Sequence, residues 1–513
     1  MRVHLLFPDR DAPRTGALPS GADDLVADLD LAPVLEVMAP RKDLAKLCPA
    51  VLLNPLTEPE VIRWRQAVLA DVLADPSGVQ GLFKLAGRAL ESQRGSWLWS
   101  GRTADSALAR SVHGLSGLLP LLTELAGLAA AQLPIARSPG LRQLYSRLVD
   151  DLDAGYLQQV RALLGQLRLP AGVTARTAIG ADGMLGGFEV QAPLSGRRPW
   201  WAVLGFAPPG RLHFTLADRD ESGARALGDL RNDALHEVAA AAAQANAHVV
   251  GFFQQLQWEA GFYVGCSQLY DRLHATGVGI CWPDPVTPSQ QDVAESPTLE
   301  QSPHLVPGRS AELEGSGLVP LNLAVRSGRV PVGNDLAGPL TLAVITGANQ
   351  GGKTTFLRSL GIAQLLLQAG VFVPATHFRA SLAGAVHTHF RRAEDEELRS
   401  GKLDEELTRM SEIVDRVRPG DLVLMNESFA ATDEVEGSWI AADIIDALLA
   451  HGVRVALVTH FHALAQHYRE RPETIFLRAE RLPDGSRSHR LIRGAPSPTS
   501  HGMDLFDQLF SPA

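Results

Sequence analysis

Apolar residues recur three and four positions apart over much of the first 170 residues and again from about 222 to 276. This spacing predicts amphipathic helices, because such positions fall on one face of a helix. The second stretch predicts a long helix that Gly261 could interrupt, since glycine weakens a helix interior. In the first stretch the pattern is clearest at 61 to 72, 105 to 133 and 141 to 168.

The pattern changes between 173 and 217 to short alternating or apolar runs broken by glycine and proline. These runs predict a small β-rich insertion, flanked by the two long helical segments. Six prolines then follow between 283 and 307, which excludes a continuous helix or a central strand there. We place the domain boundary in this stretch.

After residue 320 apolar runs alternate with helical patterns, as in an α/β domain with a largely parallel sheet. The expected strands lie at 340 to 346, 421 to 425 and 453 to 459, and the expected helices at 354 to 369, 404 to 417 and 437 to 450. The predicted organisation is a helical core at 1–140, long helices around the insertion at 141–276, a proline-rich linker at 277–319 and the α/β domain at 320–513.

Composition narrows the class of protein. With 45% hydrophobic and 20% charged residues, the 513-residue chain has the values of an ordinary globular protein. Its three widely spaced cysteines argue against a disulfide framework or a zinc cluster and fit a cytoplasmic setting. The net charge of -10 does not favour strong non-specific nucleic-acid binding, although a local basic surface is compatible with it. The N-terminus does not resemble a secretory signal, and we expect no stretch of the roughly 18 uncharged apolar residues that span a membrane.

The strongest chemical signal is a glycine-rich loop between a predicted strand and a predicted helix. Glycines let backbone N–H groups surround phosphates at the positive end of a helix, and Lys353 adds a cation over the β and γ groups. The Thr354 hydroxyl is a candidate Mg²⁺ ligand. The sequence therefore predicts an ATP site made by Gly347, Ala348, Asn349, Gln350, Gly351, Gly352, Lys353, Thr354 and Thr355.

Two further apolar strands end in polar residues. The run that begins at Asp421 is typical of a Walker B strand, and Glu427 is the candidate that orients the attacking water. Asn426 stands where an aspartate normally supports the metal; its amide can bond a metal-bound water but adds no negative charge. We therefore expect weak or altered Mg²⁺ dependence. The strand that ends at Thr459 places His460 where it can sense the γ-phosphate, although a lone histidine at a strand end is more often satisfied by structural hydrogen bonds.

These segments resemble the MutS-type mismatch-repair ATPases. In their P-loop an asparagine and a paired glycine precede the lysine, as they do here, and Thr459-His460-Phe461 resembles their Thr-His-aromatic switch. The stretch from 422 to 437 is similar without gaps to their Walker B strand and following loop, including Thr432 and Gly437. The resemblance continues in Asn334-Asp335, in 370 to 375 and, loosely, in His489 and Ser500-His501-Gly502.

Ser400-Gly401-Lys402 resembles the family signature segment, which reaches the nucleotide of the partner subunit. Its continuation, 403 to 406, departs from the family's Ser-Thr-Phe pattern. A charged, solvated helix face over 393 to 409 is the alternative.

Upstream, 56 to 59 with Arg65-Gln66 resembles the family's helical core, and the helices around the β-rich insertion resemble its lever and clamp. We expect no mismatch-reading domains before residue 25, and none of the phenylalanines in the sequence begins a Phe-x-Glu wedge. The resemblance implies a homodimer in which ATP closes two heads and repositions lever and clamp around DNA.

We therefore expect a MutS-like ATPase that uses ATP and Mg²⁺ and acts on mismatched, branched or damaged DNA. Its expected location is the cytoplasm, with association with the nucleoid as the alternative. Two alternatives stay open. Asn426 motivates a nucleotide-gated DNA clamp with negligible turnover. The acidic charge and the missing wedge motivate an ABC or chromosome-maintenance type ATPase that acts on protein or ribonucleoprotein partners.

Two aromatic pairs have weaker functional readings. His387 and His389 could ligate a metal from one strand face, but no cysteine or acidic partner at ligand spacing accompanies them, so structural roles are favoured. Trp200 and Trp201 could stack on bases, but packing of a small core is favoured.

Overall fold

The computed structural model describes residues 1–39, 44–94, 103–169, 174–179, 181, 185–191, 221–286, 311–348, 351–392, 401–471, 473–482 and 487–496. The chain forms two compact units. Unit 1 contains 1–3, 80–136 and 142–257, and unit 2 contains 4–79, 137–141 and 258–513. Both units therefore draw on segments that are far apart in the sequence.

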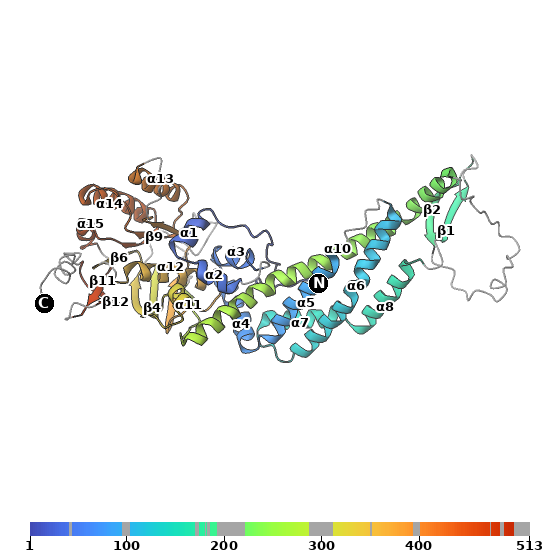
Figure 1. Ribbon diagram of the computed structural model, residues 1–513, viewed down its shortest axis with the longest axis horizontal. Coiled ribbons are helices and arrows are strands. Elements are labelled where there is room, and N and C mark those ends of the chain that lie inside the picture. The colour runs from blue at the N-terminus through green and yellow to red at the C-terminus, as the bar shows by residue number, and fades with distance from the viewer. Residues whose placement is uncertain are drawn as a thin grey trace, which may run out of the picture. The chain divides into compact units, whose positions relative to one another are not determined.

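Unit 1 is mainly helical, with one two-stranded antiparallel sheet. The helix predicted at 141–168 is in fact two helices. The break occurs because the Asp153 side chain accepts a hydrogen bond from the N–H of Tyr156 (3.0 Å) and so starts a new helix. The elements are α5 (Ser77–Arg94), α6 (Ala104–Gln132), α7 (Pro139–Asp151), α8 (Ala154–Leu167), β1 (Thr174–Ile179), β2 (Leu185–Gln191) and the first part of α10 (Glu221–Thr276) (Figure 1). Of the predicted insertion, Trp200 and Trp201 lie outside the described residues.

Helix α10 is continuous, so the interruption expected near Gly261 is wrong. Residues 259 to 267 are all buried, and packing on every side outweighs the roughly 1 kcal/mol by which glycine disfavours a helix. The fully buried Glu259 also ties the N-terminal segment to this helix. Its carboxylate accepts hydrogen bonds from the N–H groups of Leu5 (2.6 Å), Leu6 (2.8 Å) and Ala12 (3.1 Å), which offset the cost of burying its charge.

Helix α6 is long and apolar enough to cross a membrane by length and composition, although Glu124 keeps it short of a run of roughly 18 uncharged residues. The core helix of a soluble protein passes the same test, so one such helix is weak evidence for a span. Several of its leucines, including Leu118 and Leu125, are buried, and α6 packs against α8.

The larger sheet of unit 2 has six strands in the order β12-β11-β6-β10-β9-β8. All neighbours pair in parallel except β11 and β12, which confirms the predicted, largely parallel sheet. The three predicted strands correspond to β6, β9 and β10, whose residues are all buried, as expected for strands covered on both faces. The strands are β6 (Leu342–Thr346), β8 (Val386–Phe390), β9 (Leu422–Asn426), β10 (Arg454–Val458), β11 (Thr474–Arg481) and β12 (Arg487–Arg493), and the helices are α12 (Lys353–Ala369), α13 (Lys402–Val414), α14 (Glu434–Ala450) and α15 (His462–His467).

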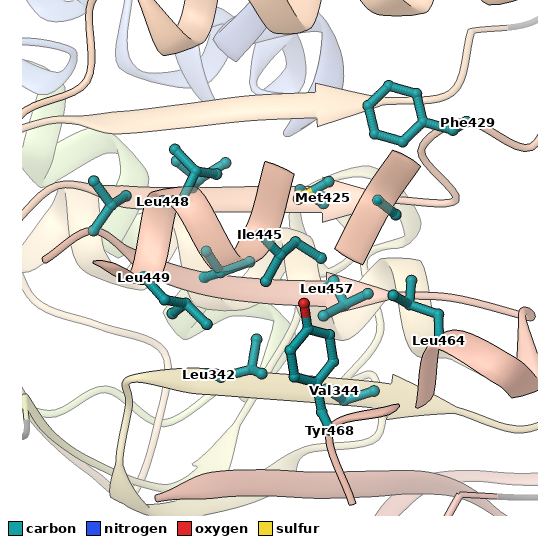
Figure 2. Packing of buried hydrophobic residues seen from close by; sticks show 14 of the residues in the cluster. Leu342, Val344, Met425, Phe429, Ile445, Leu448, Leu449, Leu457, Leu464 and Tyr468 are labelled. Atoms are coloured by element: carbon teal, nitrogen blue, oxygen red, sulfur yellow. The ribbon is translucent and has the colours of Figure 1, made fainter. Parts of the chain in front are cut away.

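One apolar cluster holds three of these strands together. Figure 2 shows side chains of α14, among them Ile445 and Leu448, gathered with residues of β6, β9 and β10 such as Val344, Met425 and Leu457. Each fully buried side chain of this kind contributes about 1.5–3 kcal/mol. The cluster therefore fixes the positions of the three strand ends where the predicted chemistry lies.

A second, four-stranded sheet in unit 2 has the order β3-β7-β4-β5. Part of the proline-rich stretch contributes its edge strand β3, where a proline removes no bond from the middle of a sheet. Helices α3 and α4 pack against α12, α1 against β8 and α2 against α11. These elements are β3 (Asp284–Val286), β4 (Glu312–Leu318), β5 (Asn334–Pro339), β7 (His377–Ser381), α1 (Ala22–Asp28), α2 (Ala32–Met38), α3 (Leu47–Leu52), α4 (Pro59–Ala74) and α11 (Leu321–Ser327).

Candidate nucleotide site

The glycine-rich loop leaves β6 at Thr346 and enters α12 at Lys353. Gly347 (φ 110°) and Gly352 (φ 91°) have backbone conformations that favour glycine, so the turn itself requires them. The predicted ligand residues Asn349 and Gln350 lie outside the described part of the loop, whereas 347, 348 and 351 to 355 are described. The loop thus has the strand and helix context that phosphate binding needs.

The hairpin of β11 and β12 packs against this loop. A Cβ atom on Gly347 would lie 2.9 Å from the Ala479 nitrogen, one on Gly351 2.6 Å from the Ala479 Cβ, and one on Gly352 3.3 Å from the His489 carbonyl oxygen. The glycines are therefore needed for this close approach as well as for phosphates. Sequence reasoning missed Ala479, because nothing local marks an alanine 132 positions after Gly347.

Asn334 holds the same hairpin in place. Its side-chain oxygen accepts a hydrogen bond from the N–H of Leu491 (2.6 Å), and its amide donates to the His489 carbonyl (3.4 Å). Asn334 and His489, two positions of the family resemblance, are therefore joined by a hydrogen bond that holds β12 beside the glycine-rich loop. Ser500-His501-Gly502 lies outside the described residues.

Lys353 lies almost completely buried in the loop, with 5% of its surface exposed. Its Nζ donates hydrogen bonds to the carbonyls of Gly347 (2.7 Å) and Ala348 (3.1 Å). Burial lowers the pKa of this ammonium, Glu427 opposes the shift, and Arg487 adds to it. A desolvated cation held inside a glycine loop is well placed to attract phosphate, and Arg487 is a second cation there that sequence reasoning missed.

The strand ends bring the predicted metal-binding pair together. The Thr354 hydroxyl donates a hydrogen bond of 2.8 Å to the side-chain oxygen of Asn426, which ends β9. Mg²⁺ prefers such oxygen ligands, so the pair fits the ion, but both oxygens are neutral. The site therefore offers Mg²⁺ less charge than one built with an aspartate.

We expect Asn426→Asp to lower the Mg²⁺ concentration needed for half-maximal ATP binding. One added negative charge near the ion contributes on the order of 1.4 kcal/mol, which is about tenfold. The measurement is a Mg²⁺ titration of nucleotide binding by fluorescence, with Thr354→Ser as a control that keeps the hydroxyl. An unchanged Mg²⁺ midpoint would show that Asn426 does not face the ion.

Glu427 and Phe429 in the following loop have left-handed backbone conformations, with φ of 51° and 62°. Non-glycine residues in this region are uncommon and cost about 1–3 kcal/mol each, so the surroundings must hold them. The N–H of Glu427 donates to the Val458 carbonyl of β10 (2.9 Å). The half-buried carboxylate thus leaves β9 at a sharp turn, close enough to Lys353 to influence its pKa.

His460 is exposed at the end of β10, beside β6 and β9. The preceding residue is well fixed, because the N–H of Thr459 donates to the Ile345 carbonyl (3.1 Å). The next ring, Phe461, packs so closely on Gly437 that a Cβ atom there would lie 2.7 Å from it. Gly437 is therefore required by the contact between α14 and the predicted switch.

Of the predicted signature segment, Gly401 and Lys402 are exposed at the beginning of α13, and Ser400 lies outside the described residues. The helix buries one face through Glu406, Met410 and Ile413 and exposes charged residues on the other. This arrangement is compatible with a segment that reaches the nucleotide of a partner subunit and also with a charged face exposed to solvent. Contact between residues 400 to 402 and the nucleotide of a partner subunit therefore stays a prediction.

His387 and His389 each have their own partners. His387 Nε2 lies 3.1 Å from a carboxylate oxygen of Asp421, which is 34 positions away in the sequence. His389 is enclosed between Ser428 and the Glu406 carbonyl. Both imidazoles are therefore hydrogen-bonded within the protein, as structural roles require.

A glycine-rich loop with a buried lysine, set beside a strand that ends in Asn426-Glu427 on a parallel sheet, defines a P-loop nucleotide-binding domain. Two family models match the chain. The model described as MutS2 N-terminal domain matches residues 57–276, and the model described as MutS domain V matches residues 343–512. The chain belongs to the MutS family.

Several curated relatives carry the name Endonuclease MutS2. That of Exiguobacterium sibiricum is 31% identical over 169 residues, which cover 33% of this chain and 21% of the relative. That of Geobacillus kaustophilus is 34% identical over 184 residues, 35% of this chain and 23% of the relative. That of Ligilactobacillus salivarius is 36% identical over 170 residues, 32% of this chain and 21% of the relative. Each match thus spans less than a quarter of the relative's length.

Proposed function

We propose that this chain is an ATP-dependent DNA-binding protein in which ATP hydrolysis drives a conformational switch in mismatch repair or the sensing of DNA structure. One observation carries the proposal. Lys353, the bonded pair Thr354 and Asn426, and Glu427 converge at the start of α12 and at the ends of β6 and β9, the two strands that flank β10. Membership of the MutS family supports the extension from nucleotide to DNA.

Each side chain has a distinct task in this proposal. The loop amides and Lys353 hold the phosphates, and Thr354 and Asn426 hold Mg²⁺, directly or through its water. The bound ion supplies positive charge that neutralises the phosphates. Glu427 orients the water that attacks the γ-phosphate, and His460 senses whether that phosphate is present.

Helix α10 and the β1–β2 sheet are proposed as the lever and clamp that act on DNA. The test is a binding panel of perfect, mismatched and branched duplexes, each with ATP, with ADP and without nucleotide. Nucleotide-dependent binding with a steep salt dependence supports the proposal, because phosphate contacts release counterions. Absence of DNA binding in every arm contradicts it and favours protein or ribonucleoprotein partners.

A nucleotide-gated clamp with negligible turnover is the second candidate, favoured by the neutral Thr354–Asn426 pair. In that case nucleotide would change DNA binding while the steady-state rate of hydrolysis, with or without DNA, stayed at background. Measurable turnover that depends on Lys353 excludes this candidate.

We propose that two copies pair through their ATPase heads. Val435 and Trp439 on α14, directly after the Walker B loop, are 78% and 71% exposed, and large apolar side chains so exposed mark interaction surfaces. Trp439→Glu is therefore expected to weaken ATP-dependent dimerisation by about tenfold or more, as measured by sedimentation velocity. Lys84→Glu, on the exposed surface of α5, is the control, and an unchanged dimer would place the interface elsewhere.

A further inference from the structure

The fully buried imidazole of His389 connects three elements around the nucleotide site. His389 is the last residue but one of β8. Its Nε2 lies 2.9 Å from the Glu406 carbonyl in α13, and its Nδ1 lies 2.7 Å from the Ser428 hydroxyl after β9. The ring also stacks on Phe429, with centroids 5.4 Å apart. A single rigid side chain thus contacts both α13, which begins with the predicted signature residue Lys402, and the loop after β9 that contains Glu427.

The chemistry of the ring assigns a direction to each bond. Burial lowers the pKa of His389 to about 4, so the ring is neutral and has one donor and one acceptor nitrogen. Because a carbonyl can only accept, Nε2 donates to Glu406, which leaves Nδ1 as an acceptor. The Ser428 hydroxyl has one proton and faces two acceptors of this histidine, Nδ1 at 2.7 Å and the carbonyl oxygen at 2.9 Å.

Ser428 is the residue between the two strained positions of the loop, Glu427 and Phe429. Left-handed conformations at such residues persist only where neighbouring groups hold them. His389 contacts Ser428 through a hydrogen bond and Phe429 through its ring face. It is therefore well placed to hold the Glu427 backbone in the conformation that directs the carboxylate.

We propose that His389 is a positioning residue that couples the orientation of Glu427 to the position of α13. The proposal rests on the proposed ATPase function. Gly401 and Lys402 begin α13, and Glu406 follows one turn later. A displacement of this helix, as when its first residues meet a partner, is transmitted through Nε2 and Nδ1 to Ser428 and thus to the water-orienting carboxylate.

His387 provides a matched control on the same strand. It lies two positions earlier and bonds Asp421, whose carboxylate also accepts from the N–H of Arg418. These partners precede β9, whereas Ser428 follows it. Substituting His387 removes an imidazole of β8 without touching the loop that contains Glu427.

The experiment separates the two bonds of His389. An asparagine amide reaches roughly as far as Nδ1 and can keep the Ser428 bond, while a glutamine amide reaches roughly as far as Nε2 and can keep the Glu406 bond. If both bonds transmit position, His389→Asn and His389→Gln each lower kcat about tenfold or more, with KM for ATP nearly unchanged. His387→Asn and His387→Gln leave both parameters near wild type, and kcat is normalised to titrated nucleotide sites so that unfolded protein does not count.

Amide hydrogen exchange gives a readout that does not depend on turnover. We expect the backbone amides of residues 427 to 433 to exchange faster than in wild type in both His389 variants. In both His387 variants these amides should exchange at the wild-type rate. The proposal is overturned if these amides exchange at the same rate in the His389 and His387 variants, or if kcat of the His389 variants equals that of wild type. A wild-type protein without ATPase activity refutes the proposed function instead, and the exchange result then decides the role of His389 separately.

Discussion

Lys353→Met is expected to abolish ATP hydrolysis and to weaken ATP binding about a hundredfold. The ammonium lies within the loop that surrounds the phosphates, and loss of a charge-assisted contact of about 3 kcal/mol corresponds to that factor. The measurements are nucleotide affinity by fluorescence titration and steady-state phosphate release. Lys84→Met, which removes an exposed lysine of α5, is the matched control and should change neither.

Folding does not confound this test. Burial lowers the Lys353 pKa, so the folded state disfavours the charged form and this lysine costs stability below its unfolded pKa. Methionine keeps the apolar stem and removes that cost, so we expect the melting temperature of Lys353→Met to equal or exceed that of wild type. Wild-type turnover in Lys353→Met would overturn the assignment of the loop.

Glu427→Gln is expected to leave ATP binding intact while slowing hydrolysis by roughly a hundredfold or more, the usual contribution of a group that positions or deprotonates a nucleophile. Glutamine has nearly the same shape, so the left-handed backbone at this position is preserved. The variant should therefore retain bound ATP. Single-turnover hydrolysis and the nucleotide content of the isolated protein measure the two effects.

The control for Glu427→Gln is Glu470→Gln, an exposed carboxylate after α15 in the same unit. It should hydrolyse ATP at the wild-type rate. If Glu427→Gln turns over normally, or if it fails to bind ATP, Glu427 does not have the proposed role.

The sequence by itself determined the elements whose signals are local. The loop at 347–354, its flanking strand and helix, and the Walker B strand were all predictable, because phosphate binding needs contiguous glycines and amides, and a strand buried on both faces reads as one apolar run. The substitution at Asn426 was also visible, since the position is defined by the end of that run.

Only the tertiary structure decided which distant residues support the site. Strand order places the β11–β12 hairpin against the glycine-rich loop. Ala479 and His489 of this hairpin leave no room for side chains at the glycines of the loop. Strand order also places β8 beside β9, so that His389 meets Ser428, 39 positions later. Likewise, burial on all sides kept α10 continuous at Gly261. Local patterns encode helices and strands, but these contacts depend on how the elements pair and pack, which residues close together in the sequence do not specify.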